Sequence, residues 1–368
     1  MIQPLIRWGI LGTANIARKN WQAIQNSGNS VLTAVASRDA ARSRRFIEEC
    51  QSEVPLSVVP TAYGSYESLL ASPEVDAVYI PLPTGVRCDW VLRAAEAGKH
   101  VLCEKPCAPN LSDLQRMTAA CRRQRVQFMD GVMFVHGLRL QRIKEVLKET
   151  TSIGEIRRIT TQFSFRGDAG FFSDNMRANS ALEPQGCVGD LGWYSLVFTL
   201  ETLGGQMPRE VSARLHSEFR HPQSPAAIPT EFSGELRFDK GVSASFYSSF
   251  ITENQQWASI SGTRGHLHVA DFVLPFSGEH SSFEIYQPDF KVQGCHFVME
   301  PRRRTETMVE SSNNAASAQE TQMIRAFANQ VNLGTLNLEW PERALKVQRL
   351  LDACLESANQ GGVPVLTS

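Results

Sequence analysis

Residues 8–18 read Trp8-Gly-Ile-Leu-Gly-Thr-Ala-Asn-Ile-Ala-Arg18, an apolar run that leads through a glycine turn into an amphipathic segment. Aligned on the G-x-G-x-x-G/A fingerprint, the three key positions are Gly12, Ala14 and Ala17. Gly12 permits the tight turn, and Ala17 is small enough for a helix to pack closely on the preceding strand. Ala14 replaces the middle glycine, so its Cβ narrows the approach of a pyrophosphate. An ordinary glycine turn is the alternative, but the helix N-terminus still offers N–H groups to a phosphate, and we expect a dinucleotide there.

The first 130 residues alternate short apolar runs with amphipathic segments, which is typical of βα units around a parallel sheet. Parallel strands joined by helices use right-handed crossovers, so we predict a doubly wound Rossmann domain. The expected strands are 5–11, 31–37, 58–62, 76–81, 100–103 and 126–130, and the expected helices are 14–25, 40–50, 66–70, 86–97 and 111–125, the last capped by Asn110.

Longer alternating segments follow residue 130 and predict a mostly antiparallel sheet with one face covered by helices. The expected strands are 156–165, 210–218, 230–238, 242–249 and 257–261, with polar loops at 221–228 and 302–317 and closing helices at 318–331 and 341–358. We therefore expect an α/β protein with two domains. Residues 1–130 form the Rossmann NAD(P)-binding domain, and residues 131–368 form an α+β domain with an open-faced sheet, for substrate binding and oligomerisation. Because an open sheet face usually needs covering, we expect a homodimer or homotetramer through this sheet.

Composition excludes several classes of protein. The formal net charge of -1 attracts neither nucleic acid nor an anionic membrane surface, so we expect no partner of either kind. No run of about 18 apolar residues predicts a spanning helix. The eight cysteines form no Cys-x-x-Cys pair and resemble neither a metal site nor a disulfide scaffold. We expect reduced thiols, no metal and a cytoplasmic location.

The end of the second strand points to the phosphorylated cofactor. An acidic residue normally receives the ribose of NAD(H) about 20 residues past the glycine loop. Here the strand ends at Ser37 and Arg38, which can bind a 2′-phosphate, and Arg42 lies one helical turn further on. Asp39 suits the following helix N-terminus. A solvated, basic helix start is the alternative reading. We predict a preference for NADP(H), with NAD(H) possible.

Two residues have the chemistry of proton donors. Lys105 follows the fifth strand, at the sheet edge where ligands bind, although a surface lysine is the alternative. If a helix begins at Asp190, then Asp190 and Tyr194 share one of its faces. Tyr194 could protonate a developing alkoxide, although a tyrosine on an apolar helix is more often part of a core.

Other polar residues have plainer interpretations. His136 follows the sixth strand near the ligand edge and could contact cofactor or substrate. His266 and His268 read as strand-surface residues rather than metal ligands, because no third ligand is nearby. The run of arginines at 302–304 reads as a solvated stretch of loop.

Several ordered motifs together resemble the Gfo/Idh/MocA oxidoreductase family over nearly the whole chain. They are the glycine loop, Ser37-Arg38, Tyr79-Ile-Pro-Leu-Pro83, Glu104-Lys105-Pro106, Met133-Phe-Val-His136, Asp190-x-Gly-x-Tyr194, Ser261-Gly-Thr-Arg-Gly265 and Trp340-Pro341. The tyrosine at 194 resembles the branch that contains dihydrodiol dehydrogenase, glucose-fructose oxidoreductase and sugar ketoreductases. The segment Phe171-Phe-Ser-Asp-Asn-Met-Arg177 is similar to the ketoreductases.

The resemblance implies hydride transfer between the nicotinamide and a sugar or sugar-like carbonyl or hydroxyl. Lys105 would be catalytic, with its Lys-Pro peptide often cis; either Lys105 or Tyr194 would donate the proton, and Asp190 would orient the substrate or the lysine. His136 and Arg177 would bind substrate. The expected cofactor contacts are Gly12, Thr13, Ala14, Asn15, Ile16, Ser37, Arg38, Arg42, Pro81, Leu82, Pro83, Glu104 and Lys105. Alternatives on the same fold are a non-catalytic NAD(P)-binding sensor or repressor, and a glycosidase that uses NAD.

Overall fold

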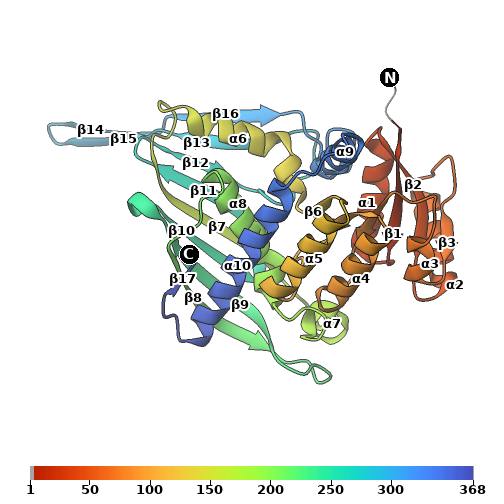
Figure 1. Cartoon of the computed structure of the whole chain (residues 1–368). Helices are drawn as coiled ribbons and strands as arrows, with labels where there is room; N and C mark the ends of the chain where they lie inside the picture. The colour runs from red at the N-terminus through yellow and green to blue at the C-terminus, as the bar shows by residue number, and fades with distance from the viewer. Residues whose placement is uncertain (1–3, 368) are drawn as a thin grey trace. The chain divides into compact units, whose positions relative to one another are not determined.

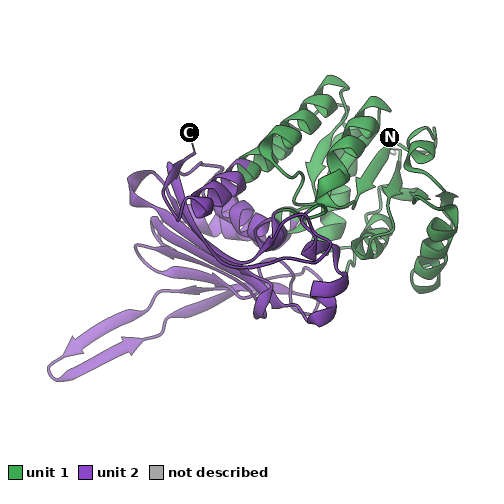
Figure 2. Ribbon diagram, turned by 90° about the horizontal axis from the view of Figure 1, so that it is seen from below, with its two compact units in different colours: residues 1–136, 181–184, 313–348 green, residues 137–180, 185–312, 349–368 purple. Residues whose placement is uncertain are grey.

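The computed structural model describes residues 4–367 and divides the chain into two compact units. Unit 1 contains the described part of residues 1–136 together with 181–184 and 313–348, and unit 2 contains 137–180, 185–312 and the described part of 349–368 (Figure 2). None of the described helices is long and apolar enough to cross a membrane. The domain boundary after residue 130 stays a prediction.

Unit 1 is built on a parallel six-stranded sheet with the strand order β3-β2-β1-β4-β5-β6. This is the order of a Rossmann sheet, so the predicted doubly wound half is confirmed. Its strands are β1 (Ile6–Leu11), β2 (Ser30–Ala36), β3 (Thr61–Tyr63), β4 (Ala77–Ile80), β5 (His100–Cys103) and β6 (Phe128–Asp130). The expected strand at 58–62 begins later than predicted: Val58 and Val59 are exposed, and Pro60 has no N–H to give to a ladder.

Helices connect these strands. They are α1 (Asn15–Asn26), α2 (Ala40–Glu53), α3 (Tyr66–Leu70), α4 (Thr84–Glu96) and α5 (Leu111–Arg123), and the 3-10 turn η1 (Met133–His136) follows β6. The predicted cap of α5 is confirmed, because the Asn110 side chain accepts a hydrogen bond from the backbone N–H of Asp113 at 2.9 Å. Asp39 caps α2 in the same way, at 2.9 Å from the N–H of Ala41.

A segment close to the C-terminus completes the core of unit 1. Helix α9 (Gln319–Asn332) packs against α1, β1 and β2 (Figure 1). The Phe327 ring lies 5.0 Å from the Trp8 ring of β1 and 6.3 Å from that of Trp340. Helix α10 (Glu339–Asn359) begins in unit 1 and ends in unit 2. The rings of Trp8, Phe327 and Trp340 therefore form an aromatic cluster that packs α9 and the start of α10 against the Rossmann sheet.

Unit 2 is built on a nine-stranded sheet with the order β16-β13-β12-β11-β7-β10-β9-β8-β17 (Figure 1). Among the described strands of this sheet, only β7 and β10 pair in parallel, so the predicted, mostly antiparallel sheet is confirmed. Its strands are β7 (Ile156–Arg166), β8 (Glu210–Phe219), β9 (Ile228–Arg237), β10 (Ser243–Ser249), β11 (Ile251–Gly262), β12 (His266–Val269), β13 (Ser281–Tyr286), β16 (Arg303–Met308) and β17 (Val365–Leu366).

One face of this sheet is covered and the other is open. Helix α6 (Leu138–Lys148) packs on β13 and β16, and α8 (Trp193–Thr202) packs on β7 and β10. Along β9, buried residues alternate with half-exposed ones, as expected for a strand with one solvated face. Unit 2 also contains α7 (Ala169–Asp174) and the short turns η2 (Met176–Ala178), η3 (Val188–Gly192) and η4 (Asp239–Gly241).

The predicted loop at 302–317 is wrong in its first half. Residues 303–308 form the edge strand β16, antiparallel to β13. Edge strands commonly carry charged side chains, which protect them from pairing with other chains, and this composition hid the strand. A hairpin of β14 (Asp289–Gln293) and β15 (His296–Glu300) was also not predicted.

Candidate active site

The glycine loop connects β1 to α1, and β1 lies at the centre of the unit 1 sheet between β2 and β4. Gly12 has φ +117°, a conformation that favours glycine, and its N–H donates to the carbonyl of Ala36 at 2.8 Å. A Cβ at Gly12 would lie 3.1 Å from a methyl carbon of Leu82, which follows β4. The structure therefore brings the dinucleotide loop and the Pro81–Pro83 segment together at the carboxyl ends of their strands, where such sheets bind ligands.

The start of α1 fits a phosphate. Ala14 occupies the N-cap position and provides no side-chain hydrogen bond to the first turn. The residues that follow, Asn15 and Ile16, are exposed, whereas Ala17 is fully buried against the sheet. The N–H of Ala17 donates to the carbonyl of Ala14, and the positive end of the helix dipole at Asn15 and Ile16 is accessible to an anion. These features fit a dinucleotide, and the small residue at 17 has the predicted packing role.

The tip of β2 is cationic. Arg38 is exposed, and Ser37 is buried, with its N–H donating to the carbonyl of Tyr63 at 3.2 Å. The guanidinium of Arg42 donates to the hydroxyl of Thr13 at 2.8 Å, which connects α2 to the glycine loop. The carboxylate of Asp39 is engaged as the cap of α2. This arrangement would hold a phosphate better than a ribose hydroxyl.

Glu104 anchors the backbone of Lys105. One carboxylate oxygen of Glu104 accepts from the hydroxyl of Tyr79 at 2.6 Å, and the other accepts from the N–H of Lys105 at 3.1 Å. Burial, and next the Glu104 charge, raise the pKa of Tyr79 well above its usual value, so its hydroxyl stays protonated and donates. The Lys105–Pro106 peptide is cis, as the resemblance implies. Lys105 is half-buried at the carboxyl end of β5.

A buried arginine that was not predicted joins two of the candidate cofactor loops. Arg87 of α4 is 2% exposed. Its guanidinium donates to the carbonyl of Leu82 at 2.9 Å and to that of Glu104 at 2.7 Å, and it also reaches the carbonyl of Pro106. The planar, multidentate guanidinium suits this task, because one side chain satisfies carbonyls of both loops. An arginine in an amphipathic helix gives no sequence signal for such a role.

Replacing Arg87 with leucine should destabilise unit 1 and disturb the site. Buried carbonyls would lose their donor, which costs about 1–3 kcal/mol for each unsatisfied group, so we expect a total loss of roughly 2–4 kcal/mol. Urea unfolding measures this loss directly. Arg93→Leu on the same helix is the matched control, because Arg93 is more than half exposed and pairs with Glu67 at the surface. Equal unfolding midpoints for the two variants would show that Arg87 does not clamp the loops.

The second set of candidate residues belongs to unit 2. Arg177, in the short turn η2, pairs with Asp190 at 2.9 Å, and their side chains are 37% and 14% exposed. The condition under which Asp190 and Tyr194 would share a helical face is not met: Asp190 lies in the π-helical turn η3, and the α-helix α8 begins at Trp193. The i,i+4 spacing therefore does not describe how Asp190 and Tyr194 relate. π-turns occur frequently at functional sites.

Tyr194 lies in the first turn of α8 and is 8% exposed. Its ring contacts the Phe163 ring of β7, with 5.7 Å between centroids. Glycine is required shortly before this helix, because Gly186 has φ +50° and a Cβ there would lie 2.2 Å from the carbonyl oxygen of Pro229. The close approach of Gly186 to β9 and the contact of Tyr194 with β7 thus fix the position of the segment between them, which contains Asp190.

The histidines have separate surroundings. In unit 1, the ring of His136 packs edge-on against Trp340, with 5.9 Å between centroids. His266 and His268 lie on β12, as predicted; His266 stacks on Tyr286 at 4.7 Å, and burial lowers the pKa of His268. Among residues 4–367, no group of three or more His, Cys, Asp or Glu side chains could hold a metal ion.

Comparisons with known proteins agree with this geometry. The GFO_IDH_MocA model, described as "Oxidoreductase family, NAD-binding Rossmann fold", matches residues 6–132, and the GFO/IDH/MocA C-terminal domain model matches residues 140–268. The chain is 31% identical over 354 residues to D-xylose 1-dehydrogenase (NADP(+)) 2 of Haloferax volcanii, covering 96% of this chain and 98% of that one. It is 30% identical to mouse (Mus musculus) trans-1,2-dihydrobenzene-1,2-diol dehydrogenase, covering 76% and 80%.

Solved structures are similar as well. KijD10, a 3-ketoreductase from Actinomadura kijaniata in complex with NADP and TDP-benzene, aligns with a TM-score of 0.78 at 26% identity. The alignment covers 96% of this chain and 98% of that one. The likeness therefore extends over both units rather than over the nucleotide-binding fold alone.

Proposed function

This chain belongs to the GFO/IDH/MocA oxidoreductase family, and from that premise we propose that it transfers hydride between NADP(H) and a sugar or sugar-like carbonyl or hydroxyl. The observation that carries the proposal is the position of Lys105. Lys105 follows the carboxyl end of β5. The neighbouring strand in the sheet is β4, and Leu82 in the loop after β4 lies next to Gly12. The relatives named above are supporting evidence, since one is an NADP(+)-dependent sugar dehydrogenase and one a ketoreductase with bound NADP.

In the proposed mechanism, Lys105 and Tyr194 act on the same substrate oxygen. When bound, the nicotinamide supplies the hydride for reduction or accepts it in oxidation. During reduction, the carbonyl oxygen gains negative charge as its π bond to carbon breaks, and Tyr194 or Lys105 donates the proton that makes the hydroxyl. Asp190, paired with Arg177, would orient the substrate hydroxyls. His136 is proposed to contact the substrate from unit 1.

Assaying purified protein against a panel of carbonyls and alcohols tests the proposed reaction. The panel would contain free pentoses and hexoses, a trans-dihydrodiol and a 3-keto sugar nucleotide, each with NADP(H) and with NAD(H). We expect absorbance changes at the nicotinamide band with at least one sugar-like substrate. Tight cofactor binding without turnover of any member would contradict an oxidoreductase and support a sensor.

Arg38→Ala should weaken NADPH binding selectively. A charge-assisted hydrogen bond to the 2′-phosphate contributes about 1.5–3 kcal/mol, so the dissociation constant should rise roughly ten- to a hundredfold. NADH, which lacks that phosphate, should bind as in the wild type. Arg45→Ala is the matched control, because Arg45 is an exposed arginine on α2, the helix that follows Arg38. Fluorescence titration measures all of these values, and equal affinity of the wild type for NADPH and NADH would contradict the preference.

We also propose that the protein works in the cytoplasm as a homodimer or homotetramer that associates through the nine-stranded sheet. All eight cysteines are unpaired and seven of them are buried, which suits a reducing compartment. The open face of the sheet offers a broad surface for a second copy. Neither a nucleic acid nor a membrane is a proposed partner.

A further inference from the structure

The β14–β15 hairpin extends beyond the nine-stranded sheet of unit 2 (Figure 2), and we refer to residues 289–300 as the arm. The arm continues the β13–β16 ladder in the same register. Tyr286 pairs with Arg303 in that ladder, and Asp289 pairs with Glu300 at the base of the arm. Two prolines, at 288 and 301, interrupt the hydrogen bonding between the two ladders, because proline has no N–H to donate. The arm is therefore a separate two-stranded ribbon.

One face of the arm is entirely apolar. Cross-strand pairs share a face and side chains alternate along a strand, so the pairs Phe290–Met299 and Val292–Phe297 lie on the same side. These four side chains are 56%, 60%, 54% and 68% exposed in that order. The opposite face is polar and contains Lys291, whose ammonium pairs with Glu300 at 2.8 Å.

This exposure is unusual for a hairpin of this size. A two-stranded ribbon is marginally stable in water, and its large apolar side chains normally need a cover. Within residues 4–367 these side chains remain more than half exposed, so the described part of the chain does not supply that cover. The face is therefore suited to contact with another molecule.

The apolar face of the arm lies on the same side as the open face of the sheet. In β13, Phe283 and Ile285 are 1% exposed and face the helices, whereas Glu284 and Tyr286 are half-exposed on the open side. Continuing this alternation in unbroken register assigns Phe290 and Val292 to the open side. The arm and the open face thus form one continuous surface.

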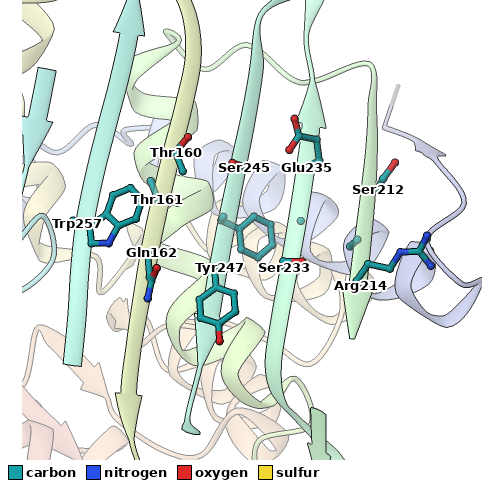
Figure 3. A pocket seen from close by; sticks show the side chains of 14 residues that line it. Thr160, Thr161, Gln162, Ser212, Arg214, Ser233, Glu235, Ser245, Tyr247 and Trp257 are labelled. Atoms are coloured by element: carbon teal, nitrogen blue, oxygen red, sulfur yellow. The ribbon is translucent and has the colours of Figure 1, made fainter. Parts of the chain in front are cut away.

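The open face carries charged side chains of both signs. It includes Arg158, paired with Glu235 at 2.8 Å, and Arg237, paired with Glu210 at 3.4 Å, so both signs are balanced. A hollow of about 400 Å³ lies on this face (Figure 3). Its lining contains none of the candidate catalytic residues and includes Thr160, Gln162, Ser233, Tyr247 and Trp257. A face with charges of both signs favours neither a polyanion nor an acidic membrane, and a second copy of the same face can meet it across a two-fold axis without a single-sign repulsion.

We propose that the apolar face of the arm packs against a second copy of this chain, as the outer part of an interface formed by the open sheet faces. Four side chains are too few for a stable interface, which buries about 1,200–2,000 Å², so the arm requires the larger surface that it continues. This inference rests on the self-association through the sheet that is proposed above, and it adds the arm as one of the elements that form the interface. The arm would supply apolar anchors at a surface that is otherwise largely polar.

The tip of the arm carries a natural probe, Cys295, which is the exposed one among the eight cysteines. We would label the intact protein at this thiol with a benzophenone maleimide, mix ¹⁴N- and ¹⁵N-labelled copies, and irradiate. A covalent dimer with crosslinks between light and heavy chains is expected. In Phe290→Ser/Phe297→Ser, the crosslink should be lost and the dissociation constant from sedimentation should rise roughly a hundredfold, or about tenfold for each anchor.

Val298→Ser is the matched control, because Val298 is 49% exposed but lies on the polar face of the arm. It should crosslink like the wild type. A wild type that sediments only as monomer at micromolar concentration would overturn both the arm and the proposed self-association. A dimer without intermolecular crosslinks, or one unaffected by the double substitution, would overturn the arm alone. Co-sedimentation with phosphatidylcholine vesicles would identify a membrane instead. NADPH-dependent turnover, measured in parallel, tests the proposed reaction independently.

Discussion

Lys105→Ala should lower kcat by about 10²–10⁴-fold or more, because the loss of a general acid typically costs a factor in this range. The substitution removes a hydrogen-bond donor from the carboxyl end of β5, and it also removes a positive charge that would stabilise a tyrosinate at Tyr194. The fold should survive, because the backbone of Lys105 remains held by Glu104 and by the carbonyl contacts of Arg87. Steady-state kinetics, with NADPH affinity measured by fluorescence, separates a loss of chemistry from a loss of binding.

Lys105→Arg provides the conservative comparison. It keeps a cation and a donor, so it should recover part of the lost turnover, while an unchanged unfolding midpoint would show that neither variant disturbs unit 1. If Lys105→Ala stayed within about threefold of the wild type, which is well below the contribution of general acid catalysis, Lys105 would not be catalytic.

Tyr194→Phe should lower kcat by about 10²–10⁴-fold while leaving NADPH affinity nearly unchanged. Only a hydroxyl is removed, and the ring can keep its contact with Phe163. Tyr247→Phe is the matched control. Its hydroxyl donates to Glu231 at 2.5 Å on the sheet, and Tyr247 lines the hollow on the open face rather than belonging to the candidate site.

Combining the two substitutions tests whether the lysine and the tyrosine serve one proton. Groups that act as a unit are strongly non-additive, so Lys105→Ala/Tyr194→Phe should be little worse than the poorer single variant. If the kcat loss of the double variant equalled the product of the two single losses, the two residues would act independently. That result would contradict the mechanism in which both act on one oxygen.

Most of the Rossmann half could be predicted from the sequence, because strands such as β1, β4 and β5 are short, largely buried apolar runs bounded by turns. The central strand shows why: Trp8, Ile10 and Leu11 are fully buried, and Arg7 is the one charged residue in β1. The third strand was displaced because its pattern begins with two exposed valines ahead of a proline.

The second half was less predictable, for identifiable physical reasons. The edge strand at 303–308 is charged, which resembles a loop in sequence. The arm has clear alternation but no partner beyond its own hairpin, so its pattern did not indicate a place in the larger sheet. The π-turn around Asp190 has no known compositional signal, and its presence changes the spacing argument made for Tyr194.

The candidate site shows the same division. Motif residues such as Gly12 and Lys105 could be identified, because their types and positions follow from cofactor chemistry. The contacts that hold them could not, because the contact of Arg87 with the carbonyl of Glu104 and the Arg177–Asp190 pair join residues of different elements. Such pairs depend on tertiary packing rather than on local pattern.

A crystal structure of the protein with NADP(H) and a turned-over substrate or product tests the central claim most directly. We predict that the Nζ atom of Lys105 and the Oη atom of Tyr194 both lie about 2.6–3.2 Å from the same substrate oxygen. The carbon bearing that oxygen should lie about 3–3.5 Å from nicotinamide C4. A complex in which Tyr194 stays packed in the core, with its hydroxyl out of reach of the substrate oxygen and of Lys105, would contradict the mechanism.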